Sequence, residues 1–448
     1  MINITKEYLS KTIERLFYLF LFLLPWQTMW IWHVGLLNAD KWEYGTFILY
    51  GTELLLWLII VLQLGVWIKS KRIGLMDLKL SSSKSKIVIG VWLLVIWSGL
   101  SIFWSPDKQL AFYWWIKLLE VVALFFIIIN LKVDFKKIGW AFLASGVIQS
   151  FLAMGQFWSQ QVIGNKWLGM AEHLPYDIGA IVISYFDGID YYRWIRAYGS
   201  LAHPNVLGGF LVVCFFLGLY LHLNYQPSLK KIISSLSLLV IFVGMFFSFS
   251  RGAWLAWLVL YLFLIVMFLV YKKVGRVNLI KLGVYLALLF AVLSVIYQPL
   301  VVSRFSGSDE LEIRSIQDRL RSMREAKQMI SENFVFGTGL GNYTYNLYLR
   351  DQSLRQWDYQ PVHNIYLLVW AELGLIGFFI FMFLYAYVFI LSLLAKKPWV
   401  SALLSVLAII SLFDHYLWTS YFGLVLWWVT IGIGVKYLYF SEKNTFLL

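Results

Sequence analysis

Cysteine and charged residues are scarce in this chain. Cys214 is the single cysteine among 448 residues, which excludes an intramolecular disulfide and a thiolate metal cluster. Only 14% of the residues are charged, whereas 61% are hydrophobic and the mean hydropathy is +0.74. This composition lies outside the range of soluble domains and predicts an integral membrane protein.

Motifs of metal and nucleotide sites are also missing from the sequence. The six histidines are scattered over separate segments, and the acids of the loops show no DxD or HExxH spacing. GTGLGNY, residues 337–343, lacks the preceding strand and the glycine spacing of a dinucleotide fingerprint, and reads as a turn. We therefore expect no metal, no cofactor and no ATP-driven pump.

Long apolar runs dominate what is present. A helix needs about 20 apolar residues to cross the hydrocarbon core with its backbone satisfied. We expect an all-α, polytopic membrane protein of about 12 transmembrane helices, forming a single integral membrane domain over residues 1–448, with a large, partly helical loop between helices 9 and 10. The predicted spans are 14–36, 46–68, 87–105, 109–130, 138–158, 205–224, 231–249, 252–271, 282–302, 364–394, 399–418 and 420–440.

Basic residues of the short loops indicate the orientation of these spans. Short loops on the cytoplasmic side of a membrane are rich in lysine and arginine. One set of alternate loops contains Lys69, Lys71, Arg72, Lys79, Lys84, Lys86, Lys132, Lys136, Lys137, Lys230, Lys231, Lys272, Lys273, Arg276, Lys281, Lys396 and Lys397. The opposite short loops carry little beyond Lys41 and Lys108. We expect a multi-pass protein of the cytoplasmic (inner) membrane with both termini in the cytoplasm, and its net charge of +13 requires no nucleic acid.

Two long segments are expected outside, a first periplasmic loop over 159–204 and a large periplasmic loop over 303–362. The cations of the large loop are mostly arginines, at positions 304, 314, 319, 321, 324, 350 and 355. A guanidinium group stays charged and donates paired hydrogen bonds to phosphate oxygens. Arginines here are therefore not a topology signal and suggest a phosphate ligand.

Helical phase ranks the arginines of the large loop. Residues 310–333 read as an amphipathic helix with Ile316, Leu320, Met323 and Ile330 on one apolar stripe. At about 100° per residue, Arg314 and Arg321 fall nearly opposite the stripe, whereas Arg319 lies about 60° from its centre. Arg319 is thus the arginine best placed to point at the membrane face.

His363 and Asn364 stand at the N-terminus of a long apolar helix on the outer side. Imidazole can take a proton near neutral pH, and a helix N-terminus favours an anion such as a diphosphate. Two interpretations of His363 stay open, a proton acceptor and a residue that caps the helix or lies in the interfacial belt.

Charged residues at the outer ends of other spans are further candidates. Arg251, in the SRG turn, is placed where an unpaired charge is costly, so we expect a ligand there in preference to a topological anchor. Arg196 is a weaker case of the same kind. Asp414, followed by His415, forms either a second functional cluster or a hydrogen bond between helices.

Several other polar residues are interpreted as structural. His203, Pro204 and Asn205 are expected to fix the turn that begins the next span. Lys117 and Glu120 lie three residues apart and can pair on one helix face. Glu53 and Glu372 have no partner that the sequence reveals.

Four segments resemble signatures of the bacterial O-antigen ligases and the related polysaccharide polymerases and protein O-oligosaccharyltransferases. They are RAYGSLAHPNVLGG, the SRG at 250–252, the arginine helix running into FGTGLGNY, and HNIYLLVWAELGLIG. The last segment is the most specific, because the ligase pattern is His, then Asn, Ser or Gln, nine residues, Gly, two residues, then a small residue or Tyr. His363, Asn364, Gly374 and Gly377 satisfy every position.

The resemblance implies a glycosyltransferase that moves a glycan from an undecaprenyl diphosphate carrier to a lipid, glycan or protein acceptor on the periplasmic side, without a metal or nucleotide sugar. The family's diphosphate-binding arginines correspond to Arg251 and Arg319, and its proposed base to His363. A late aspartate of the family is similar to Asp414. Rival candidates for the loop arginine are Arg314 and Arg324, and substrate contacts are also expected from Arg196 and Asn364.

Two alternatives to a ligase are weighed. A polymerase of the same family would join repeat units to one another and use the same carrier. A lipid-linked glycan transporter or flippase belongs to another class and often shows internal repeats and broken helices near the midplane, neither of which is visible here. We therefore place transport last.

Overall fold

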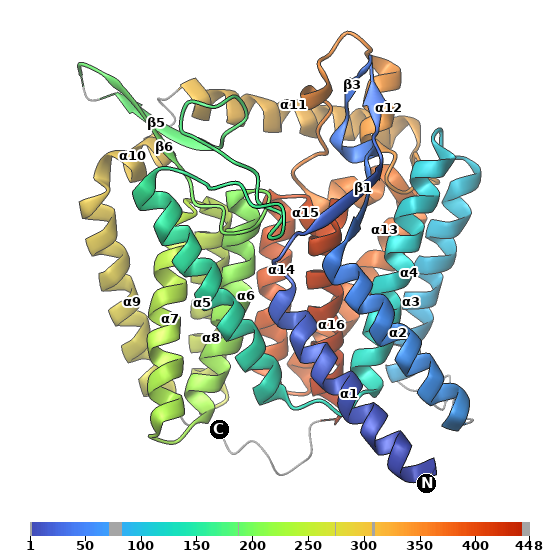
Figure 1. Cartoon of the computed structure of the whole chain (residues 1–448), viewed down its shortest axis with the longest axis vertical. Helices are drawn as coiled ribbons and strands as arrows, with labels where there is room; N and C mark the ends of the chain where they lie inside the picture. Colours follow the sequence, from blue (N-terminus) through green and yellow to red (C-terminus); the bar gives the residue numbers. More distant parts are fainter. Residues whose placement is uncertain (1, 71–82, 187, 274, 307–309, 441–448) are drawn as a thin grey trace.

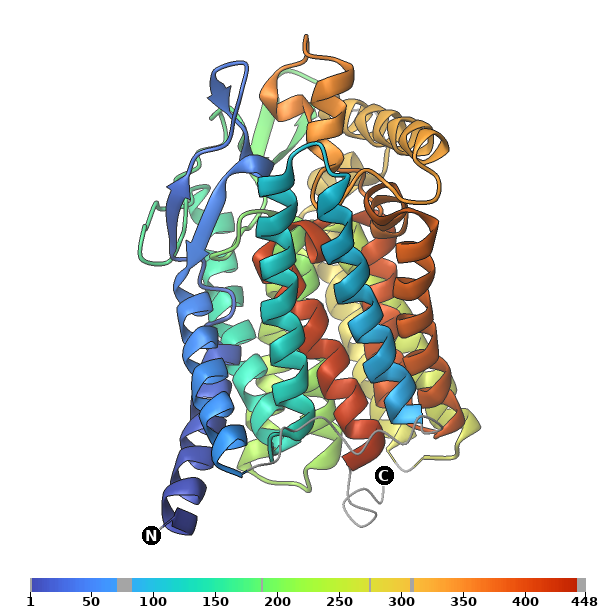
Figure 2. The same cartoon turned by 90° about the vertical axis from the view of Figure 1, so that its right-hand side faces the viewer.

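The computed structural model describes residues 2–70, 83–186, 188–273, 275–306 and 310–440. Its elements form a bundle of long helices capped at one end by short helices and β-hairpins (Figures 1 and 2). The residues that begin α1 lie at the opposite end of the bundle from this cap. Lys71, Arg72 and Lys79, used above for the orientation, lie outside the described residues.

Long helices of the bundle coincide with the expected apolar runs, which confirms an all-α polytopic membrane protein. Within the described ranges, ten helices are long and apolar enough to cross a membrane, and α14 is a shorter apolar helix. The count of twelve spans stays a prediction. The bundle contains α1 (Ile2–Leu23), α2 (Gly51–Ser70), α3 (Ser83–Leu100), α4 (Lys108–Asn130), α5 (Phe135–Ser159), α6 (Pro204–Asn224), α7 (Leu229–Phe247), α8 (Arg251–Val270), α9 (Arg276–Ile296), α13 (Ile365–Leu394), α14 (Pro398–Phe413) and α16 (Tyr421–Phe440).

Four predicted spans have wrong boundaries at the capped end. The helix of the predicted span 282–302 ends at Ile296, and α10 (Gln298–Ser306) begins after Tyr297. The first helix ends at Leu23 and does not reach residue 36, because the residue before Pro25 disfavours helical geometry. The second helix begins at Gly51, since Phe47–Tyr50 pairs instead with the strand Met29–His33. The predicted span 399–418 is interrupted after Phe413, where Asp414 has an extended backbone.

The cap at the outer end of the bundle, as we call the end opposite the start of α1, is built from short elements. Its strands pair only in antiparallel two-stranded sheets, β1 with β4, β2 with β3 and β5 with β6. The cap contains β1 (Met29–His33), β2 (Leu36–Leu37), β3 (Asp40–Lys41), η1 (Glu43–Gly45), β4 (Phe47–Tyr50), η2 (Ser101–Phe103), β5 (Val182–Phe186), β6 (Tyr191–Ile195), α10 (Gln298–Ser306), α11 (Glu310–Glu332), α12 (Tyr343–Arg350), η3 (Gln356–Asp358) and α15 (Tyr416–Thr419).

Small residues at the outer end of α6 allow close packing where the cap meets the bundle. A side chain at Gly209 would collide with the hydroxyl of Tyr416, and one at Gly208 would lie 2.9 Å from Ser250 Cβ. Helices of membrane proteins approach closely through such residues. The α7–α8 turn and α15 are thereby held against α6, one of the most buried helices of the bundle.

Helix α13 is broken at Gly374, whose backbone has φ 66° and ψ −173°. The segment after α11 fills the break: the Thr338 N–H donates to the Ala371 carbonyl at 2.9 Å, and the Gly339 N–H to the Glu372 carbonyl at 2.8 Å. In return, the Leu375 N–H donates to the carbonyl of Phe334 at 2.9 Å. GTGLGNY is therefore a turn, as predicted, and it fastens α11 to α13.

Two buried carboxylates of the bundle, Glu53 and Glu372, have partners on other elements. Lys117 on α4 forms an ion pair with Glu53 of α2, a partner that the sequence did not reveal, and also donates to the Ile48 carbonyl at 3.2 Å. Glu372 on α13 accepts a hydrogen bond from Trp418 Nε1 at 2.8 Å. These contacts join helices that are distant in sequence.

Candidate active site

A cavity of about 260 Å³ opens at the outer end of the bundle, between α6, α8, α14 and the cap elements α10 and α11. Three guanidinium groups and one carboxylate line it, together with small and apolar residues. Its lining residues are Asn205, Gly209, Ser250, Arg251, Gly252, Ala253, Leu255, Arg304, Arg319, Ile410, Phe413, Asp414 and Tyr416. We call it the arginine cavity.

The SRG turn places Arg251 at the first position of α8. Phe249 in this turn has a positive φ of 46°, and Ser250 caps the helix by accepting a hydrogen bond from the Ala253 N–H at 3.3 Å. The free N–H groups and dipole of a helix N-terminus attract anions. Arg251 and the end of α8 therefore present positive charge to the same cavity.

Glu312 joins two of the cavity's arginines. This carboxylate, buried at the start of α11, forms ion pairs with Arg251 and with Arg304 of α10. Arg251 also donates to the Arg304 carbonyl at 2.8 Å. Burial lowers the pKa of Arg304 to about 10, with the neighbouring Arg251 and Arg319 acting in the same direction and Glu312 opposing them. Arg304 is thus still charged at neutral pH.

Arg319 faces the arginine cavity from α11, whereas Arg314 and Arg324 are exposed. Burial lowers the pKa of Arg319, and the nearby carboxylate of Asp414 opposes this shift. Arg321 is engaged by Glu325 at 2.7 Å. Among the arginines of α11, the geometry therefore brings Arg319 to the site.

The apolar stripe that served to orient α11 does not pack on the protein. Ile316, Leu320 and Met323 are 41%, 55% and 38% exposed, and only Ile330 of the stripe is buried. The contact face of α11 instead contains small and polar residues, among them Ser322 and Ala326, which let the helix lie close to its neighbours. Arg319 lies on this contact face.

His363 lies beside the arginine cavity and is not one of its lining residues. Its ring packs edge-on against His415, with ring centres 5.0 Å apart, and His415 follows Asp414 of the cavity wall. Within the described part of the chain, His363 Nδ1 is buried without a hydrogen-bond partner. Burial lowers the pKa of His363, assisted by Arg319 and opposed by Asp414, so the imidazole is neutral at pH 7 and can accept a proton.

Asp414 caps the end of α14 and turns its carboxylate toward a group of polar side chains. Asn205 Nδ2 donates to one oxygen at 3.0 Å, and the His415 N–H donates to the other at 2.8 Å. Burial would raise the pKa of Asp414, but the imidazoles of His415, His363 and His203 and the amide of Asn205 outweigh it and lower the pKa. The carboxylate is therefore ionised.

Two residues predicted to contact substrate, Arg196 and Asn364, form hydrogen bonds with other groups of the protein. Arg196 is buried and donates to the Ser248 carbonyl at 2.9 Å and to Asn205 Oδ1 at 2.6 Å, which links the SRG turn to Asp414. Asn364 caps α13 by accepting from the Leu367 N–H at 3.0 Å. Both positions hold neighbouring site residues in place.

Sequence reasoning listed Arg304 among the loop arginines without singling it out, and it missed Glu312 and Asn205 as site residues. Arg304 follows an outward-going span, so the argument that singled out Arg251 applied to it equally. Asn205 was assigned to the turn that begins α6. His203 does cap that turn, accepting from the Asn205 N–H at 3.0 Å, but the Asn205 side chain also contacts Arg196 and Asp414. Nothing in the sequence pairs Glu312 with two arginines from different elements.

Comparison with known proteins gives one family. A family model described as O-antigen ligase matches residues 236–382. The matched part begins in α7, ends within α13 and contains Arg251, Arg304, Arg319 and His363. Asp414 lies outside it. No curated protein matches the chain.

Proposed function

We propose that this membrane protein transfers a glycan from undecaprenyl diphosphate to an acceptor hydroxyl, on the basis of the match of residues 236–382 to the O-antigen ligase model and of the geometry of the arginine cavity. A glycosyltransferase of ligase or polymerase type is what the family match supports. The observation that carries the finer proposal is the convergence of Arg251, Arg304 and Arg319 on one cavity beside His363.

The arginine cavity suits a diphosphate. Three guanidinium groups and the N-terminus of α8 face two carboxylates, Glu312 and Asp414, so the cavity keeps an excess of positive charge. Arginine forks bind phosphate oxygens in pairs and stabilise the charge that develops on a departing diphosphate. This charge comes from the protein itself, and the proposed reaction requires no metal.

The proposed reaction is a displacement at the anomeric carbon of the donor. The acceptor oxygen forms a bond to that carbon while the bond from carbon to the diphosphate oxygen breaks, and its electron pair stays with the diphosphate. His363 takes the proton of the acceptor hydroxyl. Attack from the side opposite the leaving group inverts the anomeric configuration.

Orientation of the site follows from the basic loops. The connections after α4, α8 and α13 contain Lys132, Lys272 and Lys396, and Lys136 and Lys230 lie in the first turns of α5 and α7. All of these positions are at the end of the bundle opposite the cap. By the positive-inside rule we propose that this end is cytoplasmic and that the arginine cavity faces the periplasm of a cytoplasmic membrane.

An apolar path for the carrier's hydrocarbon chain leaves the cavity along α8. Leu255 lines the cavity and is 40% exposed, and Leu258, Leu262 and Val266 continue an exposed stripe down the same helix. These residues recur at helical spacing on one face. We propose that the polyprenyl chain lies in the lipid against this face while the diphosphate reaches the arginines.

The test is a transfer assay with the full-length protein in detergent or lipid nanodiscs. His363→Ala should abolish glycan transfer while leaving the melting temperature within a few degrees of wild type. Lys108→Ala, at the outer end of α4 and away from the cavity, serves as the control and should transfer at the wild-type rate. Near-normal transfer by a folded His363→Ala protein would contradict the assignment of the base.

The acceptor separates the ligase from the polymerase. Incubation with lipid-linked repeat units alone should leave them unchanged if a separate lipid or protein acceptor is required. Longer glycan chains in the same incubation would make the protein a polymerase. Translocation of the glycan without any covalent product would instead indicate a flippase.

A further inference from the structure

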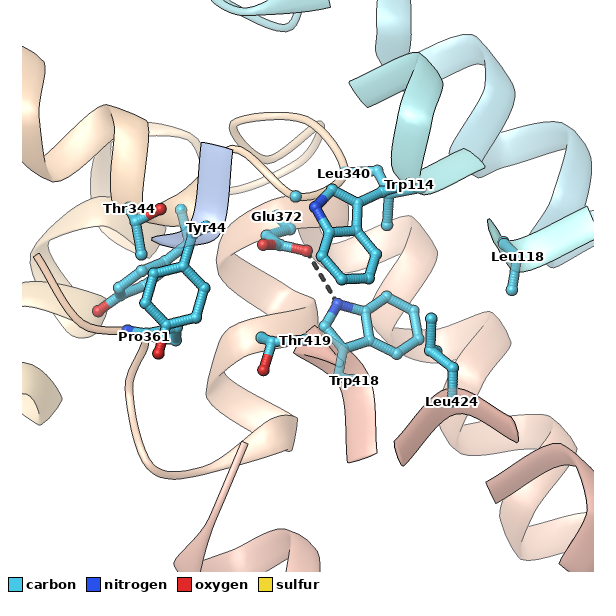
Figure 3. A pocket seen from close by; sticks show the side chains of 12 residues that line it. Tyr44, Trp114, Leu118, Leu340, Thr344, Pro361, Glu372, Trp418, Thr419 and Leu424 are labelled. Carbon is cyan, nitrogen blue, oxygen red and sulfur yellow. Dashed lines mark hydrogen bonds between the residues drawn. The ribbon is translucent and has the colours of Figure 1, made fainter. Parts of the chain in front are cut away.

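A second chamber lies on the other side of the histidine pair. It is formed by the outer ends of α4, α13 and α16 with α15, the start of α12, the turn before α12 and η1 (Figure 3). Tyr44, Trp114, Tyr343 and Trp418 give it aromatic walls, and Glu372 supplies a carboxylate. We call it the aromatic chamber.

The aromatic chamber adjoins the proposed catalytic groups through residues 414–419. Asp414 lines the arginine cavity, and Thr419, five positions later, lines the aromatic chamber. His415 Nδ1 shares a hydrogen bond with the Thr419 hydroxyl at 2.7 Å, and the His415 ring packs edge-on against both His363 and Tyr44. A ligand that enters the chamber is therefore close to the site of proton transfer.

One buried hydroxyl group that lines the aromatic chamber has no hydrogen-bond partner among the described residues. Thr344 is 2% exposed, and its Oγ1 has no hydrogen-bond partner among the residues that the structure describes. Figure 3 shows this hydroxyl on the side of Thr344 that faces Glu372. A buried hydroxyl without a partner costs free energy, so a ligand group that pairs with it is favoured.

Charge and wall chemistry define the kind of ligand. Glu372 would repel a phosphate, and no cation lines the chamber among the described residues, so the ligand group is not an anion. Aromatic faces suit the C–H surface of a sugar ring, while carboxylate and hydroxyl oxygens bind its hydroxyl groups. The free space is about 20 Å³, enough for one hydroxyl-sized group.

Resting on the proposed function, we propose that the aromatic chamber binds the hydroxymethyl arm of a saccharide, with Thr344 and Glu372 as its hydrogen-bond partners. The remainder of the sugar ring lies at the opening, near Tyr44 and Pro361. The chamber then sets which sugars are accepted next to His363. Both the donor glycan and a saccharide acceptor could supply this arm.

Glucose and xylose differ by the hydroxymethyl arm and provide matched probes. In one arm of the experiment, the affinity of the full-length protein is measured for undecaprenyl diphosphate linked to glucose or to xylose. In the other, methyl glucoside and methyl xyloside compete in the transfer assay. We expect a preference of about tenfold for the glucose form in one of these two measurements. A preference in the affinity measurement would show that the donor supplies the hydroxymethyl group, and one in the competition would show that the acceptor does.

Thr344→Val should remove this preference, and Thr344→Ser should keep it. Because the Thr344 hydroxyl has no hydrogen-bond partner among the described residues, the valine variant loses none there, and we expect it to fold. Thr52→Val, the same replacement at a buried threonine that does not line the chamber, is the control and should behave as wild type.

Equal affinity of wild type for both sugars in both arms, or an unchanged preference in Thr344→Val, would overturn the inference. Neither result would bear on the proposed function, which is judged by glycan transfer in the wild-type protein. Conversely, the protein could prefer glucose in the binding measurement and transfer no glycan. That result would contradict the proposed function and support the inference that the aromatic chamber binds a saccharide.

Discussion

Replacing Gly374 by alanine tests whether the break in α13 positions the site. The backbone of Gly374, at φ 66° and ψ −173°, lies in a region that is essentially restricted to glycine. An added Cβ would also collide with the carbonyl oxygen of Val335. We expect the variant to relieve this collision by moving the segment 334–339 away from α13.

The expected loss of glycan transfer follows from the position of this segment next to α11. Backbone strain of this kind costs about 1–3 kcal/mol, which a membrane bundle of this size should tolerate without unfolding. The same segment directly follows α11, however, and α11 carries Arg319 into the arginine cavity. A displacement of about 1 Å at a catalytic group can reduce the rate about 100-fold. We therefore expect a folded Gly374→Ala protein with a large loss of glycan transfer.

Transfer rate and melting temperature should be measured together on the purified full-length protein. Gly155→Ala on α5 is the matched control, because a Cβ there meets nothing within 4 Å. The control should keep the wild-type transfer rate. A Gly374→Ala protein that transfers glycan at the wild-type rate would refute the view that the break positions Arg319.

Further variants test the charges of the cavity. Arg304→Gln should lower kcat/KM for the lipid-linked donor about 100- to 1000-fold, as expected for loss of a group that stabilises the leaving charge, whereas exposed Arg314→Gln should stay within about twofold. Since burial lowers the pKa of His363 below its ordinary value, kcat/KM should decline with a midpoint below pH 6.5 as the pH is lowered; a decline centred above 6.5 would contradict this. Glu312→Gln should lower the melting temperature by leaving two arginines without their buried partner, and added pyrophosphate should restore more stability to this variant than to wild type.

Much of the fold could be predicted because the bilayer restricts the choices. Helices such as α4 and α6 satisfy their own backbone in lipid, so hydropathy alone located them within one residue of the observed ends. The errors that change the type of element fall in the cap, where the chain is not confined to helix. Phe47–Tyr50 is as apolar as the span it precedes, and its pairing with β1 depends on a strand that hydropathy could not distinguish from helix.

Placement of the site depended on contacts that no periodicity encodes. Arg251 and Asp414 were selected from their position at the outer ends of spans, where a charge needs a reason. Arg304 and Glu312 were not singled out because their significance comes from meeting each other and Arg251, across a gap in sequence that only the packing of α8, α10 and α11 closes.

Selection of Arg319 shows both the strength and the limit of helical phase. The predicted helix 310–333 agrees with α11, but its apolar stripe is not the face that packs on the protein, since Leu320 is more than half exposed. The stripe and the true contact face are adjacent on the helix, and Arg319 lies between the stripe and the middle of that face. Helical phase nevertheless selected the arginine of α11 that lines the arginine cavity, because a helix lying across the outer end of a membrane bundle has two faces to satisfy, one toward the protein and one apolar and open. An arginine at their boundary can reach a cavity that lies beside lipid, which is where the diphosphate of a membrane-embedded carrier would be.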